Sequence, residues 1–318
     1  MDYYKILGLQ KEPFSNSPDP NMFYPSKQHI SILQMLEISI RLKRGLNVVT
    51  GEVGTGKSTL SRQLIFRLEK DPDMDLHLIL DPRAKMPLEF LKLIAIALGI
   101  KTEEGDGEWE IKEKIKNYLF DTAVEKGKTV VLIIDEAQNL PSFGFEILRE
   151  LLNYETNENK LLQIIIFAQQ EFDDILQRYP YLKDRINYQA RLNPMNFSDM
   201  KSMIRFRLRR CSLDGRDPIP FSLPALLRIY RFTKGYPRKV INLCHRIMLT
   251  LIIKDKRYVR RSLVSACIDK NPKKRLIYRL AIIVLALALF FFCIRLYASL
   301  SPLRSFDNML ISLRDITD

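Results

Sequence analysis

The stretch LNVVTGEVGTGKSTL, residues 46–60, decides the fold. Its first five residues are apolar or β-branched apart from one asparagine, which predicts a short buried strand. Leucines with helical spacing follow it at positions 60, 64 and 68. Between strand and helix lies a complete G-x-x-x-x-G-K-[ST] motif, residues 51–58. Strand, glycine-rich loop and helix in this order predict a phosphate-binding loop.

The residue types of this loop fit a nucleoside triphosphate. Glycines let successive backbone N–H groups curl around phosphates, and the helix N-terminus adds partial positive charge. Lys57 can reach the β- and γ-phosphates, and the Ser58 hydroxyl can ligate Mg²⁺. We expect nine consecutive residues to bind the nucleotide: Gly51, Glu52, Val53, Gly54, Thr55, Gly56, Lys57, Ser58 and Thr59.

A second apolar run, TVVLIIDEAQ at residues 129–138, predicts a central parallel strand that ends in two carboxylates. In doubly wound folds such a strand ends beside the phosphate site. Asp135 would then hold Mg²⁺, directly or through water, and Glu136 would activate the attacking water. A third run, 161–170, predicts another buried strand ending at Gln169. This amide either contacts the γ-phosphate or its water, or is a simple surface amide.

After Pro194 the pattern is wholly helical, which predicts a helical C-terminal part. Ser198 is expected to N-cap the helix that follows it, and Gly235 and Pro237 to end one helix and begin the next. Arg238 would then lie in the first turn of a helix, or be a surface arginine beside a turn. Residues 101–108 predict an exposed loop.

The composition is that of a folded protein with an uneven charge. The 318 residues are 47% hydrophobic and carry a formal net charge of +13. Ten Lys or Arg against two Asp in residues 254–279 give +8, which indicates contact with phosphates of lipid head groups or nucleic acid, or a solvated helix face. The four cysteines and three histidines are scattered, so neither a disulfide framework nor a zinc site is expected.

An apolar run near the end of the chain predicts a membrane span. Residues 280–294 contain no charge, amide or hydroxyl. With its flanks the run extends over 277–298, about the 20 residues that a spanning helix needs. The segment before the run is basic, whereas the tail after Ile294 has three arginines against three aspartates and is neutral. This asymmetry predicts a single pass through a bacterial inner membrane, with the N-terminal part in the cytoplasm and a short extracytoplasmic tail at 299–318. A lid-packing or partner-binding helix is the alternative.

Four segments together resemble AAA+ ATPases of the ExeA/GspA type, which are associated with type II secretion. They are YYKILGLQKEPFSNSPDPNMFYPSKQH (3–29), TGEVGTGKST (50–59), LIIDEAQNL (132–140) and GYPRKVINLCHR (235–246). The resemblance covers about residues 1–270. It implies an α/β fold, the P-loop NTPase AAA+ core with a parallel sheet flanked by helices, over residues 1–195. A helical lid would follow at 196–270, and then a basic juxtamembrane segment at 271–276.

The resemblance also implies ATP and Mg²⁺ as cofactors and a homo-oligomeric ring. Within the ring Arg238 would be the lid's sensor arginine, and Gln169 the first sensor. A neighbouring subunit would supply a further arginine, for which Arg185 is the candidate, while Arg178 and Arg191 stay open. Residues 14–24 would wrap the adenine side.

Three functions follow as hypotheses. The first is a membrane-anchored ATPase that drives or regulates assembly of an envelope secretion or pilus complex, with inner membrane and envelope proteins as partners. The second is a DNA-dependent AAA+ regulator of the transposition type, based on KSMIRFRLRR (201–210) and the basic stretch. The third is a nucleotide-gated scaffold with slow hydrolysis.

Overall fold

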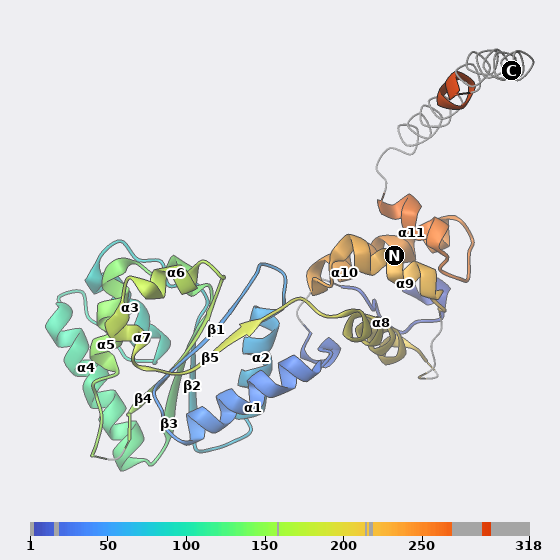
Figure 1. Ribbon diagram of the computed structural model, residues 1–318. Helices are drawn as coiled ribbons and strands as arrows, with labels where there is room; N and C mark the ends of the chain where they lie inside the picture. The colour runs from blue at the N-terminus through green and yellow to red at the C-terminus, as the bar shows by residue number, and fades with distance from the viewer. Residues whose placement is uncertain are drawn as a thin grey trace, which may run out of the picture. The chain divides into compact units, whose positions relative to one another are not determined.

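The computed structural model describes residues 3–15, 19–157, 159–213, 215, 219–268 and 288–293. Contacts divide the chain into two compact units, residues 1–264 and 265–318. The strands are β1 (Leu46–Gly51), β2 (Met74–Ile79), β3 (Thr129–Ile134), β4 (Leu162–Ala168) and β5 (Ile186–Leu192). The α-helices are α1 (Lys27–Arg41), α2 (Lys57–Leu68), α3 (Pro87–Ala97), α4 (Glu108–Phe120), α5 (Ser142–Leu151), α6 (Phe172–Gln177), α7 (Pro180–Lys183), α8 (Phe197–Cys211), α9 (Leu223–Thr233), α10 (Pro237–Ile253) and α11 (Arg261–Ile268) (Figure 1). Short helical turns are η1 (Tyr3–Leu7), η2 (Pro20–Met22), η3 (Asp121–Glu125) and η4 (Ala137–Asn139).

The five strands form one parallel sheet in the order β2-β3-β4-β1-β5. The three strands expected from apolar runs, β1, β3 and β4, are confirmed and form its interior. Strand β3 pairs with β4 in register from Val130 opposite Leu162 to Ile134 opposite Ile166. Because parallel strands share an edge for their carboxyl ends, Asp135 and Gln169 emerge side by side, next to the loop after β1.

Helices cover both faces of the sheet, as the AAA+ expectation requires (Figure 1). Successive strand residues point to opposite faces. One face packs against α1 and α2, in a core that includes Val131 and Ile133 with Leu36 and Leu64. The other face packs against α3 to α7, in a core that includes Leu132. The continuous apolar runs of β1, β3 and β4 follow from this two-sided burial.

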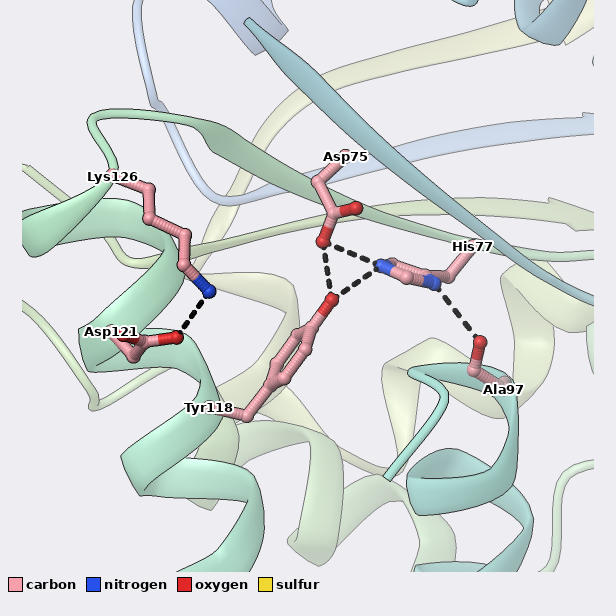
Figure 2. A network of polar contacts seen from close by, with 6 residues as sticks. All are labelled: Asp75, His77, Ala97, Tyr118, Asp121 and Lys126. Carbon is pink, nitrogen blue, oxygen red and sulfur yellow. Dashed lines mark hydrogen bonds and ion pairs between the residues drawn. The ribbon is translucent and has the colours of Figure 1, made fainter. Parts of the chain in front are cut away.

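The edge strand β2 is tied to its neighbours by a polar network near its N-terminal end (Figure 2). Tyr118 of α4 donates its hydroxyl to the Asp75 carboxylate, and His77 Nε2 lies 2.8 Å from the same oxygen. His77 Nδ1 hydrogen bonds to the Ala97 carbonyl at 2.9 Å. The network therefore fastens β2 to both α3 and α4.

The C-terminal helical part of the first unit begins after β5 and contains α8, α9, α10 and the start of α11. The expectation that Ser198 caps α8 is wrong, since Asn196 Oδ1 accepts the Asp199 N–H at 2.8 Å and the helix begins at Phe197. Asn196 and Ser198 are both polar residues that can cap a helix, and they lie two positions apart. The backbone is extended at Asn196, as an N-cap requires, whereas Ser198 already lies within the helix.

The expected break between α9 and α10 is confirmed. Lys234 and Gly235 both adopt positive φ, and Pro237 is the first residue of α10. A Cβ at Gly235 would lie 1.9 Å from the Met195 carbonyl oxygen, so only glycine fits this position. Gly235 also accepts the Met195 N–H through its carbonyl at 3.0 Å, which joins the break to the end of the sheet domain.

The expected membrane span at 277–298 lies outside the described residues except for 288–293, which are helical and exposed. Among the helices that the structure describes, none is both long enough and apolar enough to cross a membrane. The juxtamembrane segment 271–276 and the tail 299–318 also lie outside the described residues.

Candidate functional site

The loop after β1 has the backbone that phosphate binding needs. Gly54 and Gly56 adopt φ of +85° and +109°, a region that favours glycine. A Cβ at Gly51 would lie 2.6 Å from the Leu192 carbonyl oxygen, so β1 can approach the end of β5 only with glycine there. Thr55 donates its hydroxyl to the Glu52 carbonyl at 2.8 Å, which fixes the turn.

Lys57 begins α2 and points back into the loop. Its ammonium donates to the Gly51 carbonyl at 2.7 Å and to the Glu52 carbonyl at 3.2 Å. Burial lowers the pKa of Lys57, although the charges of Glu136, Asp135 and Glu171 act in the opposite direction. A buried ammonium among backbone carbonyls is well placed to gain from an anionic ligand.

Ser58 and Asp135 meet at the mouth of the loop. Burial raises the pKa of Asp135, while a hydrogen bond with the Ser58 hydroxyl partly offsets it. Among the described residues no group of three or more His, Cys, Asp or Glu could hold a metal by itself. One carboxylate and one hydroxyl fit Mg²⁺, since this ion prefers oxygen and takes its other ligands from water and phosphate. These two residues are the ones on the protein that could hold such an ion.

Glu136 follows Asp135 in the left-handed conformation, at φ 52°. This turn directs its carboxylate across the sheet edge to two amides. Gln138 Nε2 donates to Glu136 Oε2 at 2.5 Å, and Gln169 Nε2 lies 3.4 Å from the same oxygen. The Gln169 N–H in turn donates to Gln138 Oε1 at 2.9 Å. The structure thus brings Glu136 and Gln169 together, and adds Gln138, which the sequence analysis did not single out.

A cavity of about 320 Å³ gathers most of the expected residues. Seven loop and catalytic candidates line it: Val53, Gly54, Gly56, Lys57, Ser58, Thr59 and Glu136. Gln169 and Arg238 line it as well, whereas five other expected residues do not: Gly51, Glu52, Thr55, Asp135 and Arg185. Its volume is in the range of small-molecule and cofactor pockets.

Residues that the sequence analysis missed also line this cavity. They are Arg62 of α2, Arg207 of α8 and Ile241 of α10. Ser15 and Asp19 line it too, and they belong to the segment 14–24 that was expected at the adenine side. Arg207 donates to the Pro13 carbonyl at 3.2 Å, and burial lowers its pKa. The signal for Arg207 was present only as one arginine among five basic residues in 201–210.

The start of α10 contacts the loop directly. Arg238 lies in the first turn of α10, as expected, and its N–H donates to the Gly54 carbonyl at 3.3 Å. Tyr236 donates its hydroxyl to the Glu52 carboxylate. The loop and the start of α10 are therefore held together by a backbone and a side-chain hydrogen bond.

The three candidate arginines lie in different places. Arg185 directly precedes β5, so it lies at the strand-start edge of the sheet, opposite its own chain's loop. Arg178 ends α6. Arg191 lies near the carboxyl end of β5 and lines a second cavity of about 660 Å³, together with Glu52, Gln169 and Tyr236.

His29 packs against the loop; it ends the segment 3–29 that carries the family resemblance, but the sequence analysis gave it no role. The imidazole is buried, and a Cβ at Gly56 would lie 3.7 Å from its Nε2. Its Nδ1 lies 2.7 Å from the Ser26 hydroxyl. Burial lowers the pKa of His29 to about 4, so the ring is neutral at pH 7.

The chain is similar in sequence to known proteins that contain an AAA domain or act in secretion by name. Residues 40–176 match the AAA domain family. General secretion pathway protein A of Aeromonas hydrophila is 33% identical over 250 residues. The match covers 78% of this chain but 44% of that protein, so the chain spans less than half the length of its relative.

Solved structures share the fold. The Aeropyrum pernix ORC2 protein aligns with a TM-score of 0.60 at 13% identity, over 81% of this chain and 71% of that one. Cdc6p from Pyrobaculum aerophilum aligns with a TM-score of 0.59 at 17% identity, over 78% and 67% of the two chains. These likenesses confirm the AAA+ P-loop α/β fold with its parallel sheet.

Proposed function

The chain belongs to the AAA+ family of General secretion pathway protein A, and on this premise we propose that it binds ATP with Mg²⁺ and hydrolyses the γ-phosphate. The observation that carries the proposal is the shared cavity. Lys57 and Ser58 of the loop, the carboxylate of Glu136 and the lid residue Arg238 all line it. The ADPNP–ADP complexes of the Aeropyrum pernix ORC2 protein support the same ligand class.

Each residue then has one chemical task. Backbone N–H groups of residues 51–58 and the Lys57 ammonium bind the phosphates, and Ser58 and Asp135 hold Mg²⁺, which would neutralise phosphate charge. Glu136 accepts a proton from the attacking water, and Gln169 orients that water or the γ-phosphate. Arg238 binds the γ-phosphate from the lid, which is supported by its place in the cavity lining and by the backbone hydrogen bond from its N–H to the Gly54 carbonyl.

Two substitutions test this assignment. Lys57→Ala should abolish ATP binding, because the buried ammonium is the only lysine lining the cavity within the described part of the chain. Glu136→Gln should bind ATP normally and hydrolyse it at least about a hundredfold more slowly. Equilibrium binding of a fluorescent ATP analogue and phosphate release measure the two effects. Tight binding by Lys57→Ala, or normal turnover by Glu136→Gln, would refute the assignment.

We further propose that the active form is a homo-oligomeric ring in which Arg185 acts on the neighbouring subunit's nucleotide. The position of Arg185 at the strand-start edge supports this. Arg185→Ala and Lys57→Ala should each be inactive alone. Their mixture should regain part of the activity, because some interfaces then pair an intact loop with an intact arginine. No recovery on mixing would contradict a trans-acting Arg185.

At the cellular level we propose an ATPase anchored in the bacterial inner membrane that drives or regulates assembly of an envelope secretion or pilus complex. The relation to General secretion pathway protein A and the apolar run 277–298 support it. The test uses tagged full-length Glu136→Gln as a trap, crosslinked in cells and purified from solubilised membranes. Co-purified secretion or pilus proteins would support the role, and recovery from the soluble fraction with DNA would refute it.

A DNA-dependent AAA+ regulator is the second candidate, favoured by one surface. Ser202, Arg205, Phe206, Arg209 and Arg210 share one side of α8 and line a shallow cavity there. Arginines beside an aromatic ring suit contacts with a phosphate backbone. DNA binding that falls steeply with salt, and that is lost in Arg209→Glu, would favour this candidate over the first.

A further inference from the structure

We propose that Gln138 is a positioning residue for ATP hydrolysis, which couples the carboxylate of Glu136 to the end of the neighbouring strand β4. The inference rests on the proposed function, because it assigns Glu136 as the group that activates water. It adds a residue that touches neither phosphate nor metal in that scheme. Gln138 acts through the two residues that it contacts.

The geometry of Gln138 is that of a bridge. Its amide nitrogen donates to Glu136 Oε2 at 2.5 Å, and its amide oxygen accepts the backbone N–H of Gln169 at 2.9 Å. The two ends of one side-chain amide therefore bind Glu136, which follows β3, and Gln169, which follows β4. These two residues are 33 positions apart in the sequence. An amide is suited to this, since it donates and accepts in fixed directions on one rigid plane.

The local backbone makes the bridge possible. Glu136 is in the left-handed conformation, and residues 137–139 form the turn η4 directly after it. The Asn139 N–H donates to the Glu136 carbonyl at 3.0 Å and so closes this turn. The chain folds back on itself within three residues, which brings the Gln138 side chain next to the Glu136 carboxylate. A glutamate in this strained region persists only because its surroundings hold it.

Without the bridge the Glu136 carboxylate would keep one weaker contact. Gln169 Nε2 lies 3.4 Å from the same oxygen, at the limit of a hydrogen bond. A carboxylate held by one long contact samples several rotamers, whereas a carboxylate bound by two amides has one direction. Because general base catalysis needs the acceptor within hydrogen-bond reach of water, the bridge affects the chemical step and not phosphate binding.

The experiment compares wild type with Gln138→Met and Gln138→Glu. Methionine keeps the volume and removes both hydrogen bonds, while glutamate keeps an acceptor for the Gln169 N–H and loses the donor to Glu136. We expect kcat to fall by about tenfold to a hundredfold in both, as for a misplaced catalytic group. The Kd for ATP should stay within about twofold of wild type, since affinity for phosphate resides in the loop.

Gln177→Met is the matched control, because Gln177 is an exposed glutamine at the end of α6, away from the cavity. It should leave kcat, Kd and the melting temperature unchanged. Each variant's melting temperature is measured with its kinetics. If Gln138→Met is too unstable to assay, Gln138→Glu decides the matter, because it preserves the contact that joins the strands.

The outcomes separate this inference from the proposed function. A fall in kcat with unchanged Kd in either stable variant supports the positioning role. Unchanged kcat in both overturns it while leaving ATP hydrolysis intact. A parallel loss of kcat and ATP affinity would show a structural role and overturn it as well. If wild type itself hydrolyses no ATP, the proposed function and the inference both fail.

Discussion

Two polar clusters lie at opposite ends of the same sheet, and they differ in how their charges are satisfied. At the start of β2, Asp75, His77 and Tyr118 bind one another and the Ala97 carbonyl (Figure 2). At the carboxyl ends of β1, β3 and β4, Lys57, Asp135 and Glu136 line or border a cavity. The first we call the edge network and the second the nucleotide cluster.

The pKa shifts of the two clusters have opposite meanings. Burial alone would raise the pKa of Asp75, yet the hydrogen bonds from Tyr118 and His77 outweigh it and the pKa is lowered. In the nucleotide cluster burial prevails, raising the pKa of Asp135 and lowering that of Lys57. The edge network stabilises its own charge. The nucleotide cluster holds charges at a cost that a ligand of opposite sign would offset, which is typical of functional sites.

The largest expected effect separates activity from stability. Asp135→Asn should lower ATP hydrolysis by about a hundredfold or more, because a neutral amide binds Mg²⁺ poorly. The melting temperature should stay the same or rise, since the substitution removes a buried charge. Phosphate release and thermal unfolding measure both. A clear loss of stability with intact activity would contradict this prediction, because Asp135 would then stabilise the fold as the edge network does.

The next effect concerns pH. The pKa of His29 is about 4 in the folded protein against an ordinary value of 6.5, so only the unfolded chain binds this proton between pH 6.5 and 4. The free energy of unfolding should therefore fall as pH drops from 6.5 to 4, by up to about 3 kcal/mol from this residue. Asp75, whose pKa is lowered in the folded protein, stabilises the fold fully above pH 3.8. This contribution is lost only as the pH falls below 3.8.

The variant His29→Asn isolates the His29 contribution, since its side-chain oxygen can still accept the Ser26 hydroxyl. Denaturant unfolding at several pH values should show a flatter dependence between pH 6.5 and 4 in the variant. Equal slopes for variant and wild type would show that His29 is not the group responsible.

The edge network should behave in the opposite way to Asp135. Tyr118→Phe removes the hydroxyl that binds the Asp75 carboxylate, which should lower the free energy of unfolding by about 2 kcal/mol. ATP hydrolysis should be unchanged. Tyr188→Phe is the control, because burial is the one cause of its raised pKa and no hydrogen-bond partner contributes. Equal losses for both tyrosines would argue against the edge network as a source of stability.

The smallest effect lies between lid and loop. Tyr236→Phe removes the hydroxyl that binds the Glu52 carboxylate, and both groups are near the surface. We expect ATP affinity to weaken by no more than about fivefold, since exposed polar pairs contribute little. A competition assay with wild type measures the ratio of the two Kd values. A loss above tenfold would make this contact part of the nucleotide cluster.

The comparison also explains which strands could be predicted. Strands β1, β3 and β4 are covered by helices on both faces, so their sequences are continuous apolar runs. Strands β2 and β5 are the edges, and polar residues interrupt them, as Asp75 and His77 do in β2. Apolar and polar residues alternate in both strands, which favours a strand. The alternating stretches are short, however, and lie between helical and loop patterns, so they did not lead to a prediction.

Within the site, the residues that sequence analysis identified belong to a motif of fixed spacing. Lys57 and Ser58 follow from the loop pattern, and Asp135 and Glu136 from the end of an apolar run. Arg207 belongs to no such pattern, and Gln138 and His29 lie in segments that carry the family resemblance, 132–140 and 3–29, but no role follows for them from those segments. Their contacts join segments that are distant in the sequence or depend on a left-handed turn, and neither property leaves a periodic trace.

The sequence by itself determined the phosphate loop and the acidic pair, because glycine geometry, ligand chemistry and two-sided burial restrict residue types at fixed spacing. The AAA+ fold followed from the resemblance of four segments to a known family. Only the tertiary structure decided the strand order, the amide bridge at Gln138, the cap at Asn196 and the separation of Arg185 from its own chain's loop. These features depend on which segments meet in space. A hydrogen bond between distant residues requires only a donor and an acceptor, and because many residue types supply either one, no sequence pattern marks such a bond.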